Sequence, residues 1–112
     1  MKLVDTILSK KEIVELQKQY GNYVKITAEI DKEELVVGTE LHADGEKVLL
    51  TRGGQQDQIW GGGIDLTAKL IDTTAVLNLR PRLDNDSLEI LLPKRREKFI
   101  QLVKKYFARL WS

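Results

Sequence analysis

The stretch YVKITAEID, from Tyr23 to Asp31, decides the fold, because apolar and polar residues alternate along its whole length. Successive side chains of a β-strand point to opposite faces, so this period of two predicts a strand with one buried face. The apolar positions are Val24, Ile26, Ala28 and Ile30, and the polar positions are Tyr23, Lys25, Thr27, Glu29 and Asp31.

Two helices are predicted, one on each side of this strand in the sequence. Before it, Ser9 and Glu12 have the spacing of a capping box and Gly21 is a natural stop, which predicts a helix over 10–20. Near the end of the chain, Pro93 suits the first position of a helix, and the apolar residues beyond it recur at helical spacing. This pattern predicts a helix over 94–110.

The remaining segments indicate further strands. Residues 2–8 are typical of a short strand, and Asp44-Gly45 lies between two runs that can pair, which predicts a hairpin. Gly38 in its first arm suggests a bulge or a close backbone approach. Residues 53–63 hold five of the eight glycines and are expected to form a mobile loop. Two strands then follow, over 64–66 and over 70–80.

The order β-α-β-β-β-β-β-α predicts an α+β fold in one domain, residues 1–112. Short turns between neighbouring strands favour antiparallel pairing. We therefore expect a two-layer sandwich, with a mostly antiparallel sheet of five to six strands and two helices on one face. The other face is expected to be polar and open, or covered by a second subunit.

Composition excludes some classes of protein. The chain of 112 residues has no cysteine, so neither a disulfide framework nor a thiolate metal site is possible. It shows neither a signal peptide nor a membrane-spanning stretch, and we expect a cytoplasmic, soluble protein. Residues 93–112 hold seven basic residues and one acidic residue, a net charge of +6, so the others sum to −5 in a chain of +1. This asymmetry indicates either an anionic partner or docking of the basic segment on its own acidic body.

The polar sheet face is the predicted site. Period two places Glu40, His42 and Asp44 on one side of a hairpin arm, and it places Asn78 and Arg80 on one side of the 70–80 strand. We interpret His42, Asp44, Asn78 and Arg80 as candidate ligand-binding residues, because arginine binds carboxylate or phosphate in a fork geometry. Alternatively, they are solvated residues of an exposed face.

Two other kinds of chemistry are weaker candidates. Glu40, His42 and Asp44 carry the ligand types of zinc, manganese or non-haem iron, and His42 could instead be a general base. Arg95 and Arg96 lie in the first turn of the last helix, where the helix dipole disfavours cations, so they could bind an anion. The basic face of that helix also allows nucleic-acid binding, although its apolar stripe is what core packing requires.

The stretch QIWGGGIDL, residues 58–66, resembles a phosphate loop only at first sight. No Gly-Lys-Ser/Thr follows the glycines, and the residues beyond them indicate a strand where a phosphate loop needs a helix. A hinge or a tight crossing is the better interpretation. Trp60 could anchor this segment in the core or lie at an interface. Together with Trp111 it suggests a homo-oligomer.

The segments ELHADGE at 40–46, IWGG at 59–62 and LNLRP at 77–81 resemble a family of short, uncharacterised microbial proteins of unknown function. The resemblance covers nearly the whole chain and implies one domain and no particular activity. The sequence favours a small binding module for an anionic small molecule or a protein partner. A metal-assisted enzyme and a nucleic-acid binder are the alternatives, and no cofactor is indicated.

Overall fold

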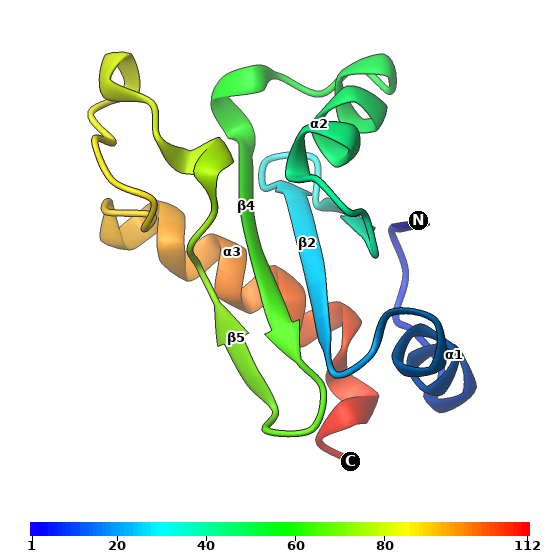
Figure 1. Ribbon diagram of the computed structural model, residues 1–112. Coiled ribbons are helices and arrows are strands. Elements are labelled where there is room, and N and C mark those ends of the chain that lie inside the picture. The colour runs from blue at the N-terminus through cyan, green and yellow to red at the C-terminus, as the bar shows by residue number, and fades with distance from the viewer.

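The computed structural model describes all residues, 1–112, as a five-stranded antiparallel sheet with three α-helices (Figure 1). The strands lie in the order β1-β3-β2-β4-β5, and the sheet is open. The α+β class and the mostly antiparallel sheet are confirmed. The strands are β1 (Lys2–Val4), β2 (Tyr23–Glu29), β3 (Glu34–Val37), β4 (Ile59–Asp65) and β5 (Leu70–Asp72), and the helices are α1 (Lys10–Tyr20), α2 (His42–Thr51) and α3 (Pro93–Tyr106).

The alternating strand is the centre of the sheet. β2 pairs with β3 on one side and with all of β4 on the other, where Lys25 lies opposite Gly63 and Thr27 opposite Gly61. Val24, Ile26 and Ala28 are completely buried, as the period of two predicts.

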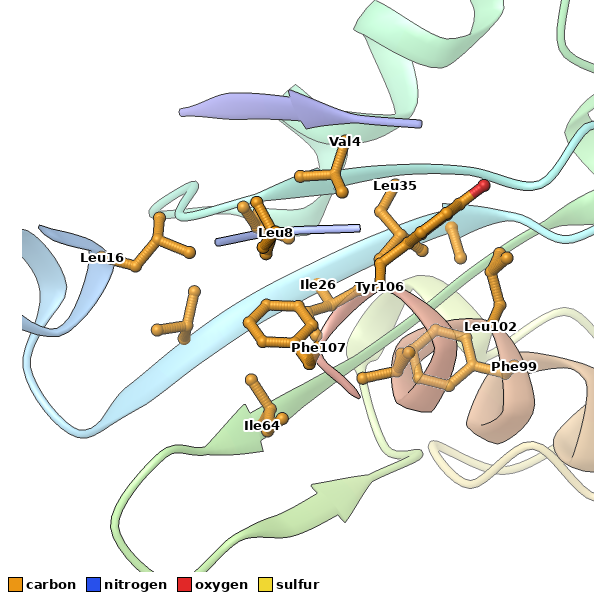
Figure 2. Packing of buried hydrophobic residues seen from close by; sticks show 14 of the residues in the cluster. Val4, Leu8, Leu16, Ile26, Leu35, Ile64, Phe99, Leu102, Tyr106 and Phe107 are labelled. Atoms are coloured by element: carbon orange, nitrogen blue, oxygen red, sulfur yellow. The ribbon is translucent and has the colours of Figure 1, made fainter. Parts of the chain in front are cut away.

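One face of the sheet packs on α1 and α3, and this is the main core of the molecule. Both predicted helices are present, with the capping box at Ser9 and Glu12 and the proline at the start of α3. The second ends earlier than predicted, at Tyr106, and a 3₁₀ turn over Ala108–Leu110 follows it. The hydrogen bond from the Ser9 backbone and the ion pair with Lys2 lower the pKa of Glu12 to about 2, so its carboxylate is ionised at neutral pH. Figure 2 shows side chains of both helices and of the strands meeting in one cluster, which includes Leu16, Ile26, Phe99 and Leu102.

The other face is covered by a third helix, so the hairpin predicted around Asp44-Gly45 is wrong. The first arm is β3, but the residues of the expected turn and second arm form α2. Gly45 is not a turn residue. It is buried where α2 crosses β2, and a methyl group there would lie 2.6 Å from Thr27 Oγ1. Leu49 of α2 packs with Val36 and Ile59, so the sheet has helices on both faces.

The glycine triplet is part of the sheet, so the expectation of a mobile loop over 53–63 fails for its second half. Gly61, Gly62 and Gly63 are interior residues of β4 and are buried. Trp60 is fully buried in the main core, which leaves it unable to contribute to an interface. The alternative of a tight crossing describes these glycines best, because their neighbours leave no room for side chains.

The strand predicted over 70–80 stops at Asp72. The Asp72 carboxylate accepts hydrogen bonds from the backbone N–H and the hydroxyl of Thr74, a local turn that competes with strand pairing. Beyond it the chain forms a 3₁₀ turn over Val76–Asn78. Polar groups in this segment therefore do not alternate between two sheet faces.

No helix combines the length and the apolar character needed to cross a membrane.

Candidate functional site

A cleft of about 510 Å³ lies beside the N-terminus of α2, on the face of the sheet opposite the main core. It brings together residues from β2, α2, β5 and the segment that follows β5. Its lining residues are Tyr23, Lys25, Leu41, His42, Ala43, Asp72, Thr74, Ala75, Val76 and Leu77.

Two glycines of β4 leave room for two aromatic rings that line this cleft. A methyl group on Gly61 would come within 3.0 Å of the His42 ring, and one on Gly63 would come within 2.3 Å of the Tyr23 hydroxyl. Any side chain at either position would displace a ring that lines the cleft. The glycine triplet thus shapes the cleft without supplying chemistry.

His42 is the first residue of α2, and one of its ring nitrogens is held by the sheet. Its Nε2 lies 2.7 Å from the carbonyl oxygen of Gly62. A carbonyl only accepts hydrogen bonds, so Nε2 carries the proton in this geometry. Burial lowers the pKa of His42 below its ordinary value, and this keeps the ring neutral at pH 7.

A phenol and a carboxylate of the cleft lining form a hydrogen-bonded pair. The Tyr23 hydroxyl donates to Asp72 Oδ2 at 2.9 Å, and Asp72 Oδ1 accepts the two bonds from Thr74. Burial and the neighbouring carboxylate raise the pKa of Tyr23, so the phenol keeps its proton and its role as donor. Three hydrogen bonds therefore partly satisfy the charge of Asp72.

Positive charge gathers at the rim of the cleft. The Lys25 ammonium donates to the carbonyl of Glu40, just before α2. The first turn of α2 has N–H groups without partners inside the helix, and its N-cap residue, Leu41, supplies no side-chain cap. Around them the wall is apolar, and Leu41 and Val76 are 61% and 77% exposed.

The model of one protein family, described as "Protein of unknown function (DUF5674)", matches residues 2–106. The chain belongs to the DUF5674 family. The predicted resemblance to a family of unknown function is confirmed, and the match includes every residue that lines the cleft. Neither the curated proteins nor the solved structures contain a match to the chain.

In this DUF5674 protein, the four predicted ligand residues do not share one surface. His42 lines the cleft, but Asp44 is exposed and lies outside it. Asn78 is completely buried, and its side-chain amide bonds to both the N–H and the carbonyl of Gly61. The amide bonds to β4 as the backbone of a neighbouring strand would. Its hydrogen-bonding groups are therefore used within the fold.

Arg80 is also committed to the scaffold. It is 8% exposed and forms an ion pair of 2.7 Å with Glu46, one turn along α2 from His42. Its Nη1 donates to the carbonyls of Gln56 and Ile59. Burial lowers the pKa of Arg80, and the charge of Glu46 opposes that shift. Arg80 thus fastens the segment after β5 to α2 and β4, and it does not line the cleft.

The two arginines at the start of α3 also have partners within the chain. The Arg95 guanidinium lies 4.1 Å from the centre of the Trp60 ring, a cation–π contact. Arg96 donates to the carbonyl of Ile90 at 3.1 Å. These contacts account for cations at a position that the helix dipole disfavours, so the arrangement favours neither an anion site there nor nucleic-acid binding.

The metal alternative has no geometric support. Glu40, His42 and Asp44 fall on the turn before α2 and on its first residues, so the strand spacing assumed for them is wrong. No group of three or more His, Cys, Asp or Glu side chains is placed to hold a metal ion.

The sequence pattern did not indicate that Tyr23 and Lys25 line the cleft. Both belong to the polar set of the alternating strand, and that signal was present in the sequence. What was absent was the register, which places Lys25 opposite Gly63 and so next to the cleft. Asp72 and its hydrogen-bond partner Tyr23 lie 49 residues apart in the chain, so no local pattern pairs them.

Proposed function

We propose that this protein is a small binding module, and that its cleft takes a small organic acid with an apolar body. One observation carries this proposal. A single cleft of about 510 Å³ combines a lysine ammonium and an uncapped helix N-terminus with an apolar wall. Clefts of about 300–1,000 Å³ are typical of small-molecule sites.

Charge supports an anionic head group. Lys25 is half-buried at the rim, and the N-terminus of α2 adds a partial positive charge beside it. The one carboxylate in the lining, Asp72, already accepts three hydrogen bonds. A carboxylate near Lys25 would therefore be attracted to the ammonium and to the N-terminus of α2 more strongly than it is repelled by Asp72.

The apolar wall supports a hydrocarbon body of modest size. Leu41, Ala75, Val76 and Leu77 all line the cleft, and Leu41 and Val76 are largely exposed. Covering them removes apolar surface from water, at about 25 cal/mol per Å². The acid would place its head at Lys25 and its body along this wall.

The probe that tests this proposal is 3-phenylpropionate, with 3-phenylpropylamine as a cation of the same shape. We expect the acid to bind and to shift the backbone amide signals of Ala43, Gly61 and Gly63 in an NMR titration. We expect the amine to produce no saturable shift. Equal binding of acid and amine, or shifts confined to residues outside the cleft, would contradict the proposal.

Replacing Lys25 by methionine is expected to weaken binding of 3-phenylpropionate about tenfold, because a charge-assisted hydrogen bond is lost. Lys47→Met is the matched control, since Lys47 is exposed on α2 and does not line the cleft. Calorimetry measures both affinities, and thermal unfolding shows that each variant is folded. An unchanged affinity in Lys25→Met removes Lys25 from the site.

We also propose that the chain self-associates. Four large apolar side chains between β5 and α3 are exposed and lie outside the cleft, and we infer that they form a patch of the kind that marks a protein interface. They are Leu79, Leu88, Leu91 and Leu92.

In sedimentation experiments we expect the wild type to be heavier than one chain. Leu79→Ser with Leu91→Ser is expected to lower that mass, whereas Leu70→Ser, at an exposed residue of β5, is not. A monomer at high protein concentration would remove this proposal.

A further inference from the structure

We propose that His42 selects the occupant of the cleft by accepting a hydrogen bond at Nδ1, so that the preferred ligand is a hydroxylated organic acid. This inference rests on the proposed function and narrows its ligand class. It makes His42 a specificity-determining residue, beside the charge recognition assigned to Lys25.

The hydrogen bond to Gly62 sets the tautomer of His42. Nε2 donates to the carbonyl of Gly62 at 2.7 Å, so the neutral ring has its only proton there. Nδ1 then bears a lone pair and can only accept. The contact with Gly62 also holds the ring against β4, because the absent side chain of Gly61 leaves room for it.

The other ring nitrogen of His42, Nδ1, is available to a ligand. It has no hydrogen-bond partner within the chain, and it is not among the buried polar atoms that lack one, which are Glu34 Oε1 and Thr39 Oγ1. His42 lines the cleft, and we infer that a molecule in the cleft reaches this nitrogen.

His42 Nδ1 differs from the other polar side chains of the cleft, which already have hydrogen-bond partners. The Tyr23 hydroxyl and the Thr74 hydroxyl both donate to Asp72, so their protons and part of the acceptor capacity of Asp72 are used within the chain. Lys25 offers further N–H groups, which are donors only. His42 Nδ1 is thus a side-chain acceptor of the cleft lining with no hydrogen bond of its own, and an occupant gains a new bond there by presenting a hydroxyl.

The experiment uses two pairs of acids that differ by one hydroxyl. They are 3-phenyllactate with 3-phenylpropionate, and 3-hydroxyoctanoate with octanoate. For the wild-type chain we expect the hydroxylated member of at least one pair to bind about five- to tenfold more tightly, as one neutral hydrogen bond allows.

Two variants separate the roles of the residues. In His42→Gln, the glutamine amide can still donate to Gly62, but it offers no acceptor at the position of Nδ1. We expect this variant to bind both members of a pair equally. Lys25→Met is expected to weaken both members and to keep their ratio.

The outcomes distinguish the two proposals. If the wild type binds the members of both pairs equally, the inference fails and the proposed function stands. A hydroxyl preference that persists in His42→Gln also overturns the inference. If none of the four acids binds, both proposals fail. Thermal unfolding of each variant shows whether a lost affinity reflects a lost fold.

Discussion

Gly62→Ala is expected to lower the free energy of unfolding by about 4 kcal/mol or more, enough to leave much of the chain unfolded. A methyl group at Gly62 would lie 2.1 Å from the backbone carbonyl oxygen of Asp72 and 2.8 Å from the ring of Phe99. The first neighbour is main chain within the sheet, so relief requires β4 and β5 to separate. Urea denaturation followed by circular dichroism measures the effect.

The neighbouring glycine is the matched control. In Gly61→Ala the nearest atoms are side chains, Ala75 Cβ at 2.8 Å and His42 Cδ2 at 3.0 Å. We expect a cost of about 1–3 kcal/mol, and we expect the second change Ala75→Gly to recover part of it. No comparable rescue exists for Gly62→Ala, since its closest contact is backbone. A Gly62→Ala chain as stable as the wild type would show that β5 does not pack as described.

Asn78→Ala is expected to destabilise the fold by about 3–5 kcal/mol, because it leaves several buried backbone groups without partners. The Asn78 side chain accepts from Gly61 N at 2.8 Å and donates to the carbonyls of Gly61, Leu88 and Thr73. These bonds join the segment after β5 to Gly61, in the part of β4 that β5 does not pair with. Denaturation experiments on Asn78→Ala measure the loss.

Asn22→Ala is the control for this substitution. Asn22 is exposed, and its side chain accepts one bond, from Gln17, so we expect a change within about 0.5 kcal/mol. The comparison also decides the role of Asn78. If Asn78→Ala keeps full stability and loses binding of 3-phenylpropionate, then Asn78 is a ligand residue, as its position in the sequence first suggested.

The candidate site shows how far a sequence pattern reaches. His42 was predicted to be a site residue, and it lies in the cleft although its predicted secondary structure was wrong. Asn78 and Arg80 were interpreted as exposed because polar residues in a strand of one open face point to water. The chain after Asp72 is not a strand, so both side chains turn inward and bond to backbone groups of Gly61 and Ile59.

The hairpin error has a related cause. Two runs around Asp44-Gly45 are as compatible with pairing as with a helix, and local pattern does not separate these outcomes. The helix is favoured over the hairpin because Leu49 packs on Val36 and Ile59 of the sheet, and because Gly45 allows close contact with β2. Both conditions depend on residues that are distant in sequence.

The sequence by itself determined the elements whose signals are local: the capped helix α1, the alternating strand β2 and the amphipathic helix α3. Capping and side-chain periodicity act between residues a few positions apart, so they can be read along the chain. Tertiary structure alone decided the roles of the three glycines of β4, of Asn78 and of the cleft around His42. Each depends on what lies across from it, and only strand register and helix packing bring those partners within contact distance.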